Sequence, residues 1–508
     1  MNKCPEILSN GNGRSVERAA DRSDQSDHST NTLPGTSASF VKYQTNPFSP
    51  FRATTFPPGV PPQVPQNQQR SCSIVPDRKL GGRTILRPIL FVFIPGIPYR
   101  TDSFIDMSTE SLPTVLLKPG EADRIVAGHP WVYHTSILRM TAQPGDGELV
   151  QVKDHRQRLL GVGFFNSKSR IHVRVLSPER IEVNEAFFEQ RIREALAVRQ
   201  KHMPRATSFR VVNAESDFLS GLIVDKYEDV LVVQISALGM DKRKAQIVAV
   251  LQKIFSPRAI LERSEVASRK FEGLTEASGV LAGEFSGPIS TNLNGLKFET
   301  DLIEGHKTGL YLDQQANYEA VSRFAKGAQV LDCFSFLGGF GLHAARNGAA
   351  QVHLLDQSAD AIAASKRNAE TNGLADKCSF EATNVFDWLK AHTKTVPTEK
   401  LIPKFDLIIL DPPSFTRNRA SVPDALRGYK EIHLRALKLL KPGGTLATFC
   451  CSHHVDAGLF QDTVLSAAYD AHKVLRRVAA YSQSPDHPII PMIPETEYLK
   501  GFAFEVVR

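Results

Sequence analysis

Short runs of apolar residues recur along most of the chain, and their period differs between regions. Between residues 114 and 180, the segments TVLLK, ELVQVKD, LLGVGFF and RIHVRVLS alternate between apolar and polar positions and are separated by glycine-containing turns. Alternation with a period of two is typical of strands that bury one face. We therefore expect a small β-barrel domain over residues 114–180.

A mixed pattern follows over residues 181–300. The segments AFFEQRIREALAVRQKH and DKRKAQIVAVLQKIF have helical periodicity, and GLIVDKYEDVLVVQIS between them predicts a hairpin. GLKFETDL is a further expected strand. These elements predict a small α+β domain.

Over residues 301–508, apolar strands alternate with helical segments. The expected strands are QVLDCFS, QVHLLD, CSFEAT, FDLIILD and TLATFCC, and the expected helices are 339–347, 359–371, 385–392 and 427–440. Short apolar strands joined by helices predict an α/β domain with a parallel, doubly wound sheet that is covered on both faces. A ligand of such a sheet binds at the carboxyl ends of the strands.

The first 106 residues have a different composition. They contain 13 of the 31 prolines of the chain, together with tracts such as SDQSDHSTNT and PPGVPPQVPQNQQ. Such a segment cannot bury enough apolar surface to offset the entropy of ordering, so we expect a disordered extension. Met107 is a candidate start codon, which would make residues 1–106 a gene-model artefact. A regulatory or RNA-contacting tail is the alternative interpretation.

Charge and cysteine content narrow the function classes only slightly. The net charge of +7 favours an anionic partner, and residues 114–178 carry nine Lys and Arg against five Asp and Glu. This local excess suits an RNA-docking module, and a solvated surface explains it equally well. Six cysteines in 508 residues form no disulfide framework and have no metal-ligand spacing. We expect free thiols, a cytoplasmic location and no metal.

Three consecutive strand ends carry residues that suit an adenosine ligand. Asp332 ends the first strand, and Gly338 and Gly339 open the next helix, where backbone N–H groups can approach a ligand. Asp356 ends the second strand and could accept hydrogen bonds from ribose hydroxyls. Asn384 and Val385 end the third and could frame an adenine ring. The alternatives are a tight turn that needs glycine for packing and an N-cap role for Asp356.

The last two strand ends carry residues that suit chemistry on a base. Asp411, Pro412, Pro413 and Phe415 follow the fourth strand, where two prolines stiffen the loop and Phe415 offers a stacking face. The fifth strand ends in two adjacent cysteines, one of which is a candidate nucleophile. Side chains alternate along a strand, so the two should face opposite ways and only one can be catalytic.

These residues resemble a known family. From about Thr114 to the C-terminus, the chain is similar to the class I methyltransferases that make 5-methylcytosine in 23S ribosomal RNA of the large subunit. The segments that carry the resemblance are AGHPWVY, FLSGLIVDKY, RSEVASRKFEGL, GHKTGLYLDQQANY, CFSFLGGF, LDPPSF, RGYKEIHLRAL, FCCSHHV and DHPIIPMIPETEYLKGF. The resemblance implies an N-terminal PUA domain, a middle domain and a Rossmann-like domain with a mostly parallel seven-stranded sheet.

The resemblance also implies a cofactor and site roles. S-adenosylmethionine is the implied cofactor, and Cys451, directly before Ser452, is the implied nucleophile that adds to C6 of the cytosine. Asp411 would support the activation of the cytosine, and Cys450 would be a packing residue. The implied cofactor contacts are Gln314, Asp332, Phe334, Gly338, Gly339, Asp356, Asn384, Val385 and Asp411, and those with the base are Pro412, Pro413 and Phe415. Asn384 departs from the pattern, because this position is often acidic in the family.

The implied partner is 23S ribosomal RNA, in an unassembled or partly assembled large subunit, and a homodimer is a further expectation from the resemblance. Two alternatives are an RNA methyltransferase with a different base target and a non-catalytic ribosome-assembly factor that keeps the fold. The first would need no cysteine, and the second would tolerate loss of the glycine turn or of Asp411, both of which are present.

Overall fold

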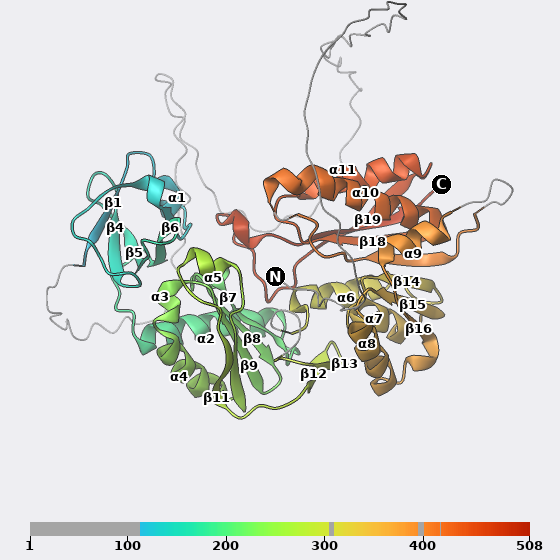
Figure 1. Cartoon of the computed structure of the whole chain (residues 1–508), viewed down its shortest axis with the longest axis horizontal. Helices are drawn as coiled ribbons and strands as arrows, with labels where there is room; N and C mark the ends of the chain where they lie inside the picture. The colour runs from blue at the N-terminus through green and yellow to red at the C-terminus, as the bar shows by residue number, and fades with distance from the viewer. Residues whose placement is uncertain (1–111, 304–308, 395–400, 417) are drawn as a thin grey trace, which may run out of the picture. The chain divides into compact units, whose positions relative to one another are not determined.

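The computed structural model describes residues 112–303, 309–394, 401–416 and 418–508 (Figure 1). All of these residues belong to one compact unit, Ser103–Arg508. The expected disordered extension and the candidate start codon Met107 lie outside the described residues. Among the described helices, none combines the length and the apolar character needed to cross a membrane.

The first described domain is a six-stranded mixed sheet with the order β2-β6-β5-β4-β1-β3. Four of its strands were predicted, while β2 and β3 have only three and four residues and show no clear alternation. Its core contains Val115, Val150, Phe165 and Val173. The elements are β1 (Thr114–Leu117), α1 (Asp123–Val126), β2 (Trp131–Tyr133), β3 (Ile137–Met140), β4 (Leu149–Lys153), β5 (Leu159–Phe165) and β6 (Ile171–Ser177).

A five-stranded sheet with the order β11-β10-β9-β8-β7 forms the middle domain. The two predicted helices and the antiparallel β8–β9 hairpin are confirmed. A two-stranded hairpin, β12–β13, then leads into the last domain. The elements are α2 (Glu185–His202), β7 (Phe209–Asn213), β8 (Leu222–Tyr227), β9 (Val230–Ile235), α3 (Leu238–Asp241), α4 (Lys244–Phe255), β10 (Ala259–Arg263), α5 (Ser268–Phe271), β11 (Ser278–Gly283), β12 (Ile289–Leu293) and β13 (Leu296–Thr300).

The last domain is built on a seven-stranded sheet with the order β16-β15-β14-β17-β18-β20-β19. Its first five strands are parallel, and β20 runs antiparallel to both β18 and β19. The expected α/β fold class, mostly parallel with seven strands, is confirmed. The strands are β14 (Gln329–Cys333), β15 (Gln351–Asp356), β16 (Cys378–Ala382), β17 (Phe405–Leu410), β18 (Leu440–Cys450), β19 (Leu475–Ser482) and β20 (Lys500–Val506).

Helices cover both faces of this sheet (Figure 1). Alternate residues of one strand enter two different cores: Val330 packs in the core on one face and Leu331 in the core on the other. This period-two burial explains why the strands are apolar almost throughout. One face carries α6 (Gln315–Ser322), α7 (Gly339–Arg346) and α8 (Ala359–Thr371), and the other carries α9 (Val385–His392), α10 (Val422–Leu439) and α11 (Ala457–Asp470).

Candidate active site

The carboxyl ends of the parallel strands bring the predicted chemical residues to one edge of the sheet. In the strand register, Cys333 lies opposite Leu410, and Leu410 lies opposite Thr448. Asp411 directly follows Leu410, and Cys451 comes three residues after Thr448, directly after the end of β18. Burial, followed by the charges of Asp411, Asp313, Cys451 and Asp356, raises the pKa of Tyr311 to about 12. Groups from four separate segments therefore lie within electrostatic reach of one tyrosine.

The turn between β14 and α7 is held by the two acids that end β14 and β15. Phe334 and Phe336 have left-handed backbone conformations, with φ of 64° and 49°, which side chains rarely adopt. The Phe336 N–H donates to Asp356 Oδ2 at 2.9 Å, and the Gly341 N–H donates to Asp332 Oδ2 at 2.8 Å. Asp356 thus binds the turn itself and Asp332 binds the first turn of α7, so the two acids together stabilise this unusual path.

The glycines of this turn are required by packing. A Cβ atom at Gly339 would lie 2.5 Å from the Tyr318 ring, and one at Gly338 would lie 2.5 Å from Ser365 Oγ. Gly338 also has a φ of 87°, which favours glycine. Packing alone therefore accounts for these glycines, and they do not by themselves indicate a ligand.

The groups that indicate a ligand are buried polar atoms beside the turn. In the part of the chain that the structure describes, Asp332 Oδ1, Ser335 Oγ and Ser365 Oγ are buried without a hydrogen-bond partner. Burial first, and then the charges of Asp411 and Asp356, raise the pKa of Asp332 to about 8, although the hydrogen bond from the Gly341 N–H acts in the opposite direction. Concentrated negative charge and unpaired oxygens fit a polar cationic ligand, and S-adenosylmethionine carries a sulfonium and an ammonium group.

Asp356, Asn384 and Gln314 already have partners within the protein. Asp356 does not cap the next helix, because Ser358 Oγ accepts from the Ala361 N–H and Asp356 Oδ1 accepts from the Ser358 N–H at 2.9 Å. Asn384 is the N-cap of α9, and its Oδ1 accepts the N–H groups of the second and third following residues. Gln314 is buried, and its Oε1 accepts from Asn317 Nδ2 at 2.7 Å.

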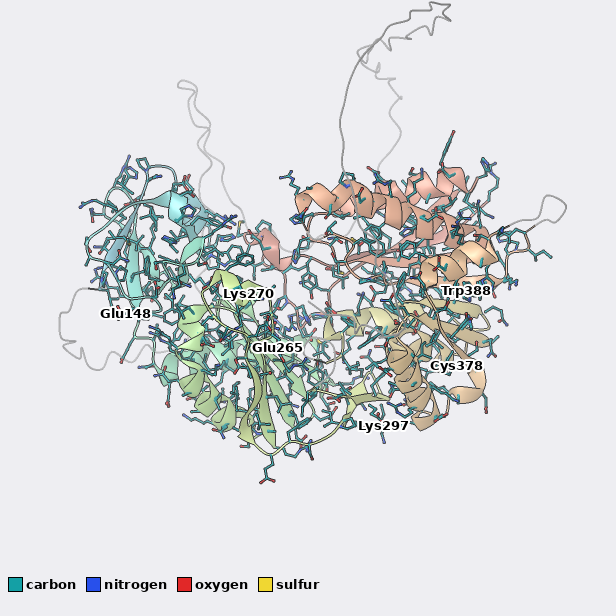
Figure 2. The ribbon with its side chains drawn as sticks, viewed as in Figure 1. Glu148, Glu265, Lys270, Lys297, Cys378 and Trp388 are labelled. Atoms are coloured by element: carbon teal, nitrogen blue, oxygen red, sulfur yellow. The ribbon has the colours of Figure 1, made fainter. Side chains whose placement is uncertain are left out.

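The four described cysteines differ sharply in their surroundings. Cys333 is fully buried, and burial raises the pKa of its thiol well above the usual range. Cys378 begins β16, at the opposite end of the sheet (Figure 2), and burial raises the pKa of its thiol to about 11. Cys450 is buried, and its Sγ donates to the Tyr429 hydroxyl at 3.4 Å. Cys451 is half-buried and comes directly after β18.

Cys450 and Cys451 face opposite sides of the sheet, as the alternation of side chains predicted. Cys450 belongs to the core with α10 and α11, whereas Cys451 packs against the core that contains α6 and α7. The face that carries Cys451 is the face of the Gly-rich turn and of Tyr311. The structure therefore separates a packing cysteine from one that borders the strand-end site.

Hydrogen bonds tie the loop after β17 to the loop after β18. Ser414 Oγ lies 2.9 Å from Ser452 Oγ, which in turn lies 3.1 Å from the Tyr429 hydroxyl of α10. In the same loop, Pro412 is buried and Pro413 is exposed. The loop that begins with Asp411 is therefore hydrogen-bonded to the loop that begins with Cys451.

A row of aromatic rings borders this edge of the sheet. The ring centroids are 6.4 Å apart for Phe334 and Phe386, 5.7 Å for Phe386 and Phe415, and 4.6 Å for Phe415 and Tyr429. Phe415 and Phe334 were predicted site residues, while Phe386, Tyr429 and Tyr311 were not. For Phe386 the available signal was its position a few residues after the expected strand CSFEAT, whereas Tyr311 and Tyr429 lie near no expected strand end.

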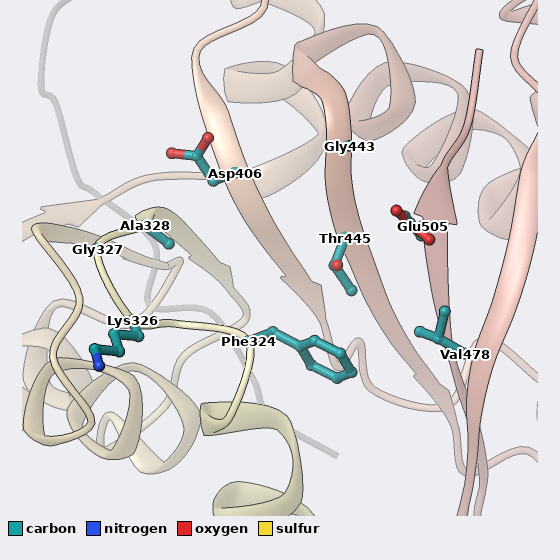
Figure 3. Close-up of a pocket in the computed structure, with 9 residues that line it drawn as sticks. All are labelled: Phe324, Lys326, Gly327, Ala328, Asp406, Gly443, Thr445, Val478 and Glu505. Carbon is teal, nitrogen blue, oxygen red and sulfur yellow. The ribbon is translucent and has the colours of Figure 1, made fainter.

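The pocket in Figure 3 lies at the other end of the sheet. It has a volume of about 500 Å³, and its lining includes Asp406 at the start of β17 and Glu505 near the end of the antiparallel β20. Lys441 Nζ donates to Asp406 at 2.9 Å, and Arg476 pairs with Glu505 at 3.0 Å. Its carboxylates are therefore already neutralised, and none of the predicted site residues lines it.

Comparisons with known proteins agree with this architecture. Residues 115–178 match a family model of a PUA-like domain, and residues 259–494 match a model of an S-adenosylmethionine-dependent methyltransferase. A solved structure of a candidate methyltransferase complexed with SAH is 20% identical, with a TM-score of 0.66, and the match covers 77% of this chain and all of that one. A candidate SAM-dependent methyltransferase from Streptococcus mutans has a TM-score of 0.65 at the same identity and the same coverage of both chains. These likenesses show the fold.

Two curated relatives are similar over almost their whole length. The ribosomal RNA large subunit methyltransferase I of Pseudoalteromonas translucida is 40% identical over 397 residues, which cover 77% of this chain and 99% of that protein. The protein of the same name from Shewanella amazonensis is 41% identical over 401 residues, with the same coverage of both chains. Together with the fold and the strand-end site, this similarity shows that the chain is an S-adenosylmethionine-dependent methyltransferase and belongs to the ribosomal RNA large subunit methyltransferase I family.

Proposed function

We propose that this enzyme methylates C5 of a cytosine in 23S ribosomal RNA through a covalent bond between Cys451 and C6 of the base. The observation that carries the proposal is the position of Cys451. Of the four cysteines in the described part of the chain, it alone is half-buried at the carboxyl end of a central strand, on the side of Tyr311 and the Gly-rich turn. Methyl transfer to an oxygen or nitrogen lone pair would need no thiol there.

The proposed roles follow from the reactivity of the base. C5 of cytosine is a poor nucleophile, and addition of the Cys451 thiolate to C6 moves an electron pair onto C5. C5 then forms the bond to the methyl group that S-adenosylmethionine supplies from its sulfonium. Loss of the C5 proton and breakage of the bond between Sγ and C6 restore the aromatic base and the thiolate.

Asp411 and the aromatic row have proposed roles in holding the base. Asp411 is half-buried and precedes the segment whose Ser414 is bound to Ser452, and we propose that its carboxylate accepts a hydrogen bond from the cytosine amino group. Phe415 offers a face on which a flat base can stack. A base inside a duplex cannot reach such a site, so the substrate nucleotide is single-stranded or flipped out.

The cofactor contacts remain part of the proposal. The proposed contacts gather at the turn between β14 and α7, beside the unpaired oxygens. They are Asp332, Phe334, Gly338 and Gly339, with Asp356 next to the turn. Because Asn384 Oδ1 already caps α9, we propose that Asn384 offers the adenine its Nδ2 hydrogens in place of a charged acceptor. Val385 is buried directly after it and would pack against the ring.

The substrate class rests on the relatives, whose names state ribosomal RNA of the large subunit. The +4 charge of residues 114–178 suits docking to an RNA backbone. We propose that the RNA is presented in an unassembled or partly assembled subunit.

The test measures transfer of labelled methyl from S-adenosylmethionine to unmodified 23S transcript and to assembled large subunits, followed by nucleoside analysis. Cys451→Ser should abolish 5-methylcytosine, while the matched neighbour variant Cys450→Ser should keep most of the activity, because Cys450 lies in the opposite core. Label in another nucleoside would overturn the cytosine target. Full activity of Cys451→Ser would overturn the covalent route.

A further inference from the structure

A lysine lies beside the loop that follows β18. Lys500 begins β20 and pairs in register with Cys450, the last residue of β18. Lys500 Nζ donates to the carbonyl oxygen of Ser452 at 2.7 Å and to that of Tyr498 at 2.9 Å. Ser452 directly follows Cys451, so the ammonium group is bound to the backbone next to the proposed nucleophile.

The charge of this lysine is not neutralised by an ion pair. Both hydrogen-bond acceptors of Nζ are neutral carbonyls, and among the described residues Lys500 forms no ion pair. An ammonium group that is half-buried without a carboxylate interacts more strongly with other nearby groups than one in water does.

Those nearby groups are the two thiols. Burial lowers the pKa of Lys500, and the opposing charges that favour its protonated form are, in order, those of Cys450, Cys451, Glu497 and Asp456. The same positive charge contributes to the lowered pKa of His453, after burial. The electrostatic influence of Lys500 therefore reaches the loop that carries the nucleophile.

The tyrosines and carboxylates that are coupled electrostatically to Cys451 do not favour its ionisation. Tyr311 before α6 and Tyr429 on α10 both have raised pKa values, through burial first, and both are neutral at physiological pH. Asp411 and Asp356 act on Tyr311 together with Cys451, and their negative charges oppose a second anion. His453 and His454 lie in the turn after Ser452.

We propose that Lys500 is a positioning residue whose ammonium group favours the thiolate form of Cys451. This inference rests on the proposed function of Cys451 as nucleophile. A thiol with an ordinary pKa of about 8.5 is only partly ionised at neutral pH, whereas addition to C6 needs the thiolate. The contact with Ser452 O fixes the cation next to the nucleophile, and Lys500 itself touches neither substrate nor cofactor in this role.

The test measures ionisation of the thiol without RNA or cofactor. Iodoacetamide alkylation of the Cys451 peptide is followed by mass spectrometry from about pH 6 to 10 in the full chain, in a Cys450→Ser background. Lys500→Met removes the charge and keeps the chain length, Lys500→Gln is a second neutral variant that can still donate to Ser452 O, and Lys500→Arg keeps the charge. Circular dichroism shows which variants are folded.

We expect both neutral variants to move the alkylation midpoint upward by about one pH unit, and so to slow alkylation about tenfold at neutral pH. Lys500→Arg should stay close to the parent protein. Methyl transfer by the neutral variants should recover toward higher pH, with an unchanged KM for S-adenosylmethionine.

An unchanged midpoint in a folded neutral variant would overturn the inference, even if that variant loses activity, because the lysine would then act only structurally. Failure of the proposed function looks different: Cys451→Ser would still methylate RNA. In that case a shifted alkylation midpoint would still show that Lys500 acts electrostatically on Cys451, but Lys500 would have no role in catalysis.

Discussion

Asp332 illustrates how a single residue can serve both the fold and the site. Its Oδ2 accepts the Gly341 N–H at the start of α7, while its Oδ1 is buried without a partner among the described residues. Burial raises the pKa of its carboxyl group to about 8, so a large fraction is protonated at neutral pH in the folded protein without ligand. In the unfolded chain the same group ionises near a pH of about 4.

The pH dependence of stability follows from this difference. Between about pH 4 and pH 8 the folded state binds more protons at Asp332 than the unfolded state, so this residue lowers the free energy of unfolding as pH rises, by at most about 1.4 kcal/mol per pH unit. Asp332→Asn keeps an acceptor for the Gly341 N–H and removes the titration. We expect the variant to gain stability relative to wild type between pH 5 and pH 8, measured by urea unfolding.

Comparing the variant with wild type cancels the contributions that other titrating groups make to the pH dependence of stability. His433 is buried, and burial lowers its pKa to about 4, so its contribution to stability is lost as pH falls from about 6.5 toward 4 in both proteins. Parallel stability curves of Asp332→Asn and wild type would contradict the prediction. Asp332→Ala should lose stability at every pH, because it leaves the Gly341 N–H unpaired.

At the scale of elements, the turn between β14 and α7 shows how strictly packing determines a loop. Two left-handed phenylalanines and Gly338 redirect the chain within five residues, and Gly339 then begins the helix against the ring of Tyr318. The helix can start there only because no side chain separates it from α6. Strand ends are close enough to share one site because this connection is short.

Gly339→Ala should therefore disturb the turn, since the new Cβ would lie 2.5 Å from the Tyr318 ring. Overpacking of this kind costs about 1–3 kcal/mol. We expect a lower thermal midpoint and a higher Kd for S-adenosylmethionine, measured by calorimetry.

Gly428→Ala on α10 is the matched control. Its Cβ would meet the Phe415 ring at 3.4 Å, an ordinary contact, and alanine favours a helix interior over glycine by about 1 kcal/mol. It should keep or raise the thermal midpoint. If both variants have the same thermal midpoint and the same Kd for S-adenosylmethionine, the close approach of Gly339 to Tyr318 is not required for stability or for cofactor binding.

At the scale of the whole described unit, the middle and catalytic domains are joined by a common core and by buried charges. Val232 and Leu261 of the middle sheet belong to the same apolar cluster as Phe298 and Tyr318. Arg199 on α2 forms two hydrogen bonds with Asp217, at 2.5 and 2.7 Å, and its Nη2 also donates to the Asp486 carbonyl oxygen at 2.8 Å. The segment after β19 is thus bound directly to the middle domain.

Asp217→Ala should strongly destabilise this arrangement. It would leave the fully buried guanidinium of Arg199 without its carboxylate, which costs about 3–5 kcal/mol. We expect the variant to unfold at a lower urea concentration than wild type, and tryptophan fluorescence and circular dichroism monitor the transition.

Asp229→Ala removes one partner of an exposed ion pair with Arg258, in which both side chains are about half exposed, and serves as the control. It should cost less than about 1 kcal/mol. Equal destabilisation by the two variants would show that the buried pair does not hold the segment after β19.

The sequence alone determined what depends on local periodicity. The helices 359–371 and 385–392 were predicted with the observed bounds, because their apolar spacing is a local signal, whereas their caps, Ser358 and Asn384, were identified only in the structure. The opposite directions of Cys450 and Cys451 followed from strand alternation in the same way. The order of strand ends placed Asp332, Asp356, Asp411 and Cys451 at one edge, because parallel strands share that edge.

Only the tertiary structure decided which groups surround these residues. Tyr311, Tyr429 and Lys500 reach the site from positions that are up to 140 residues distant from Cys451, and no local pattern distinguishes them from other tyrosines and lysines. The strands β19 and β20 and the core shared with the middle sheet were not identified from the local pattern for the same reason. Backbone periodicity is set by near neighbours in the chain, whereas burial and charge coupling depend on distances in space, which arise only when the chain is folded.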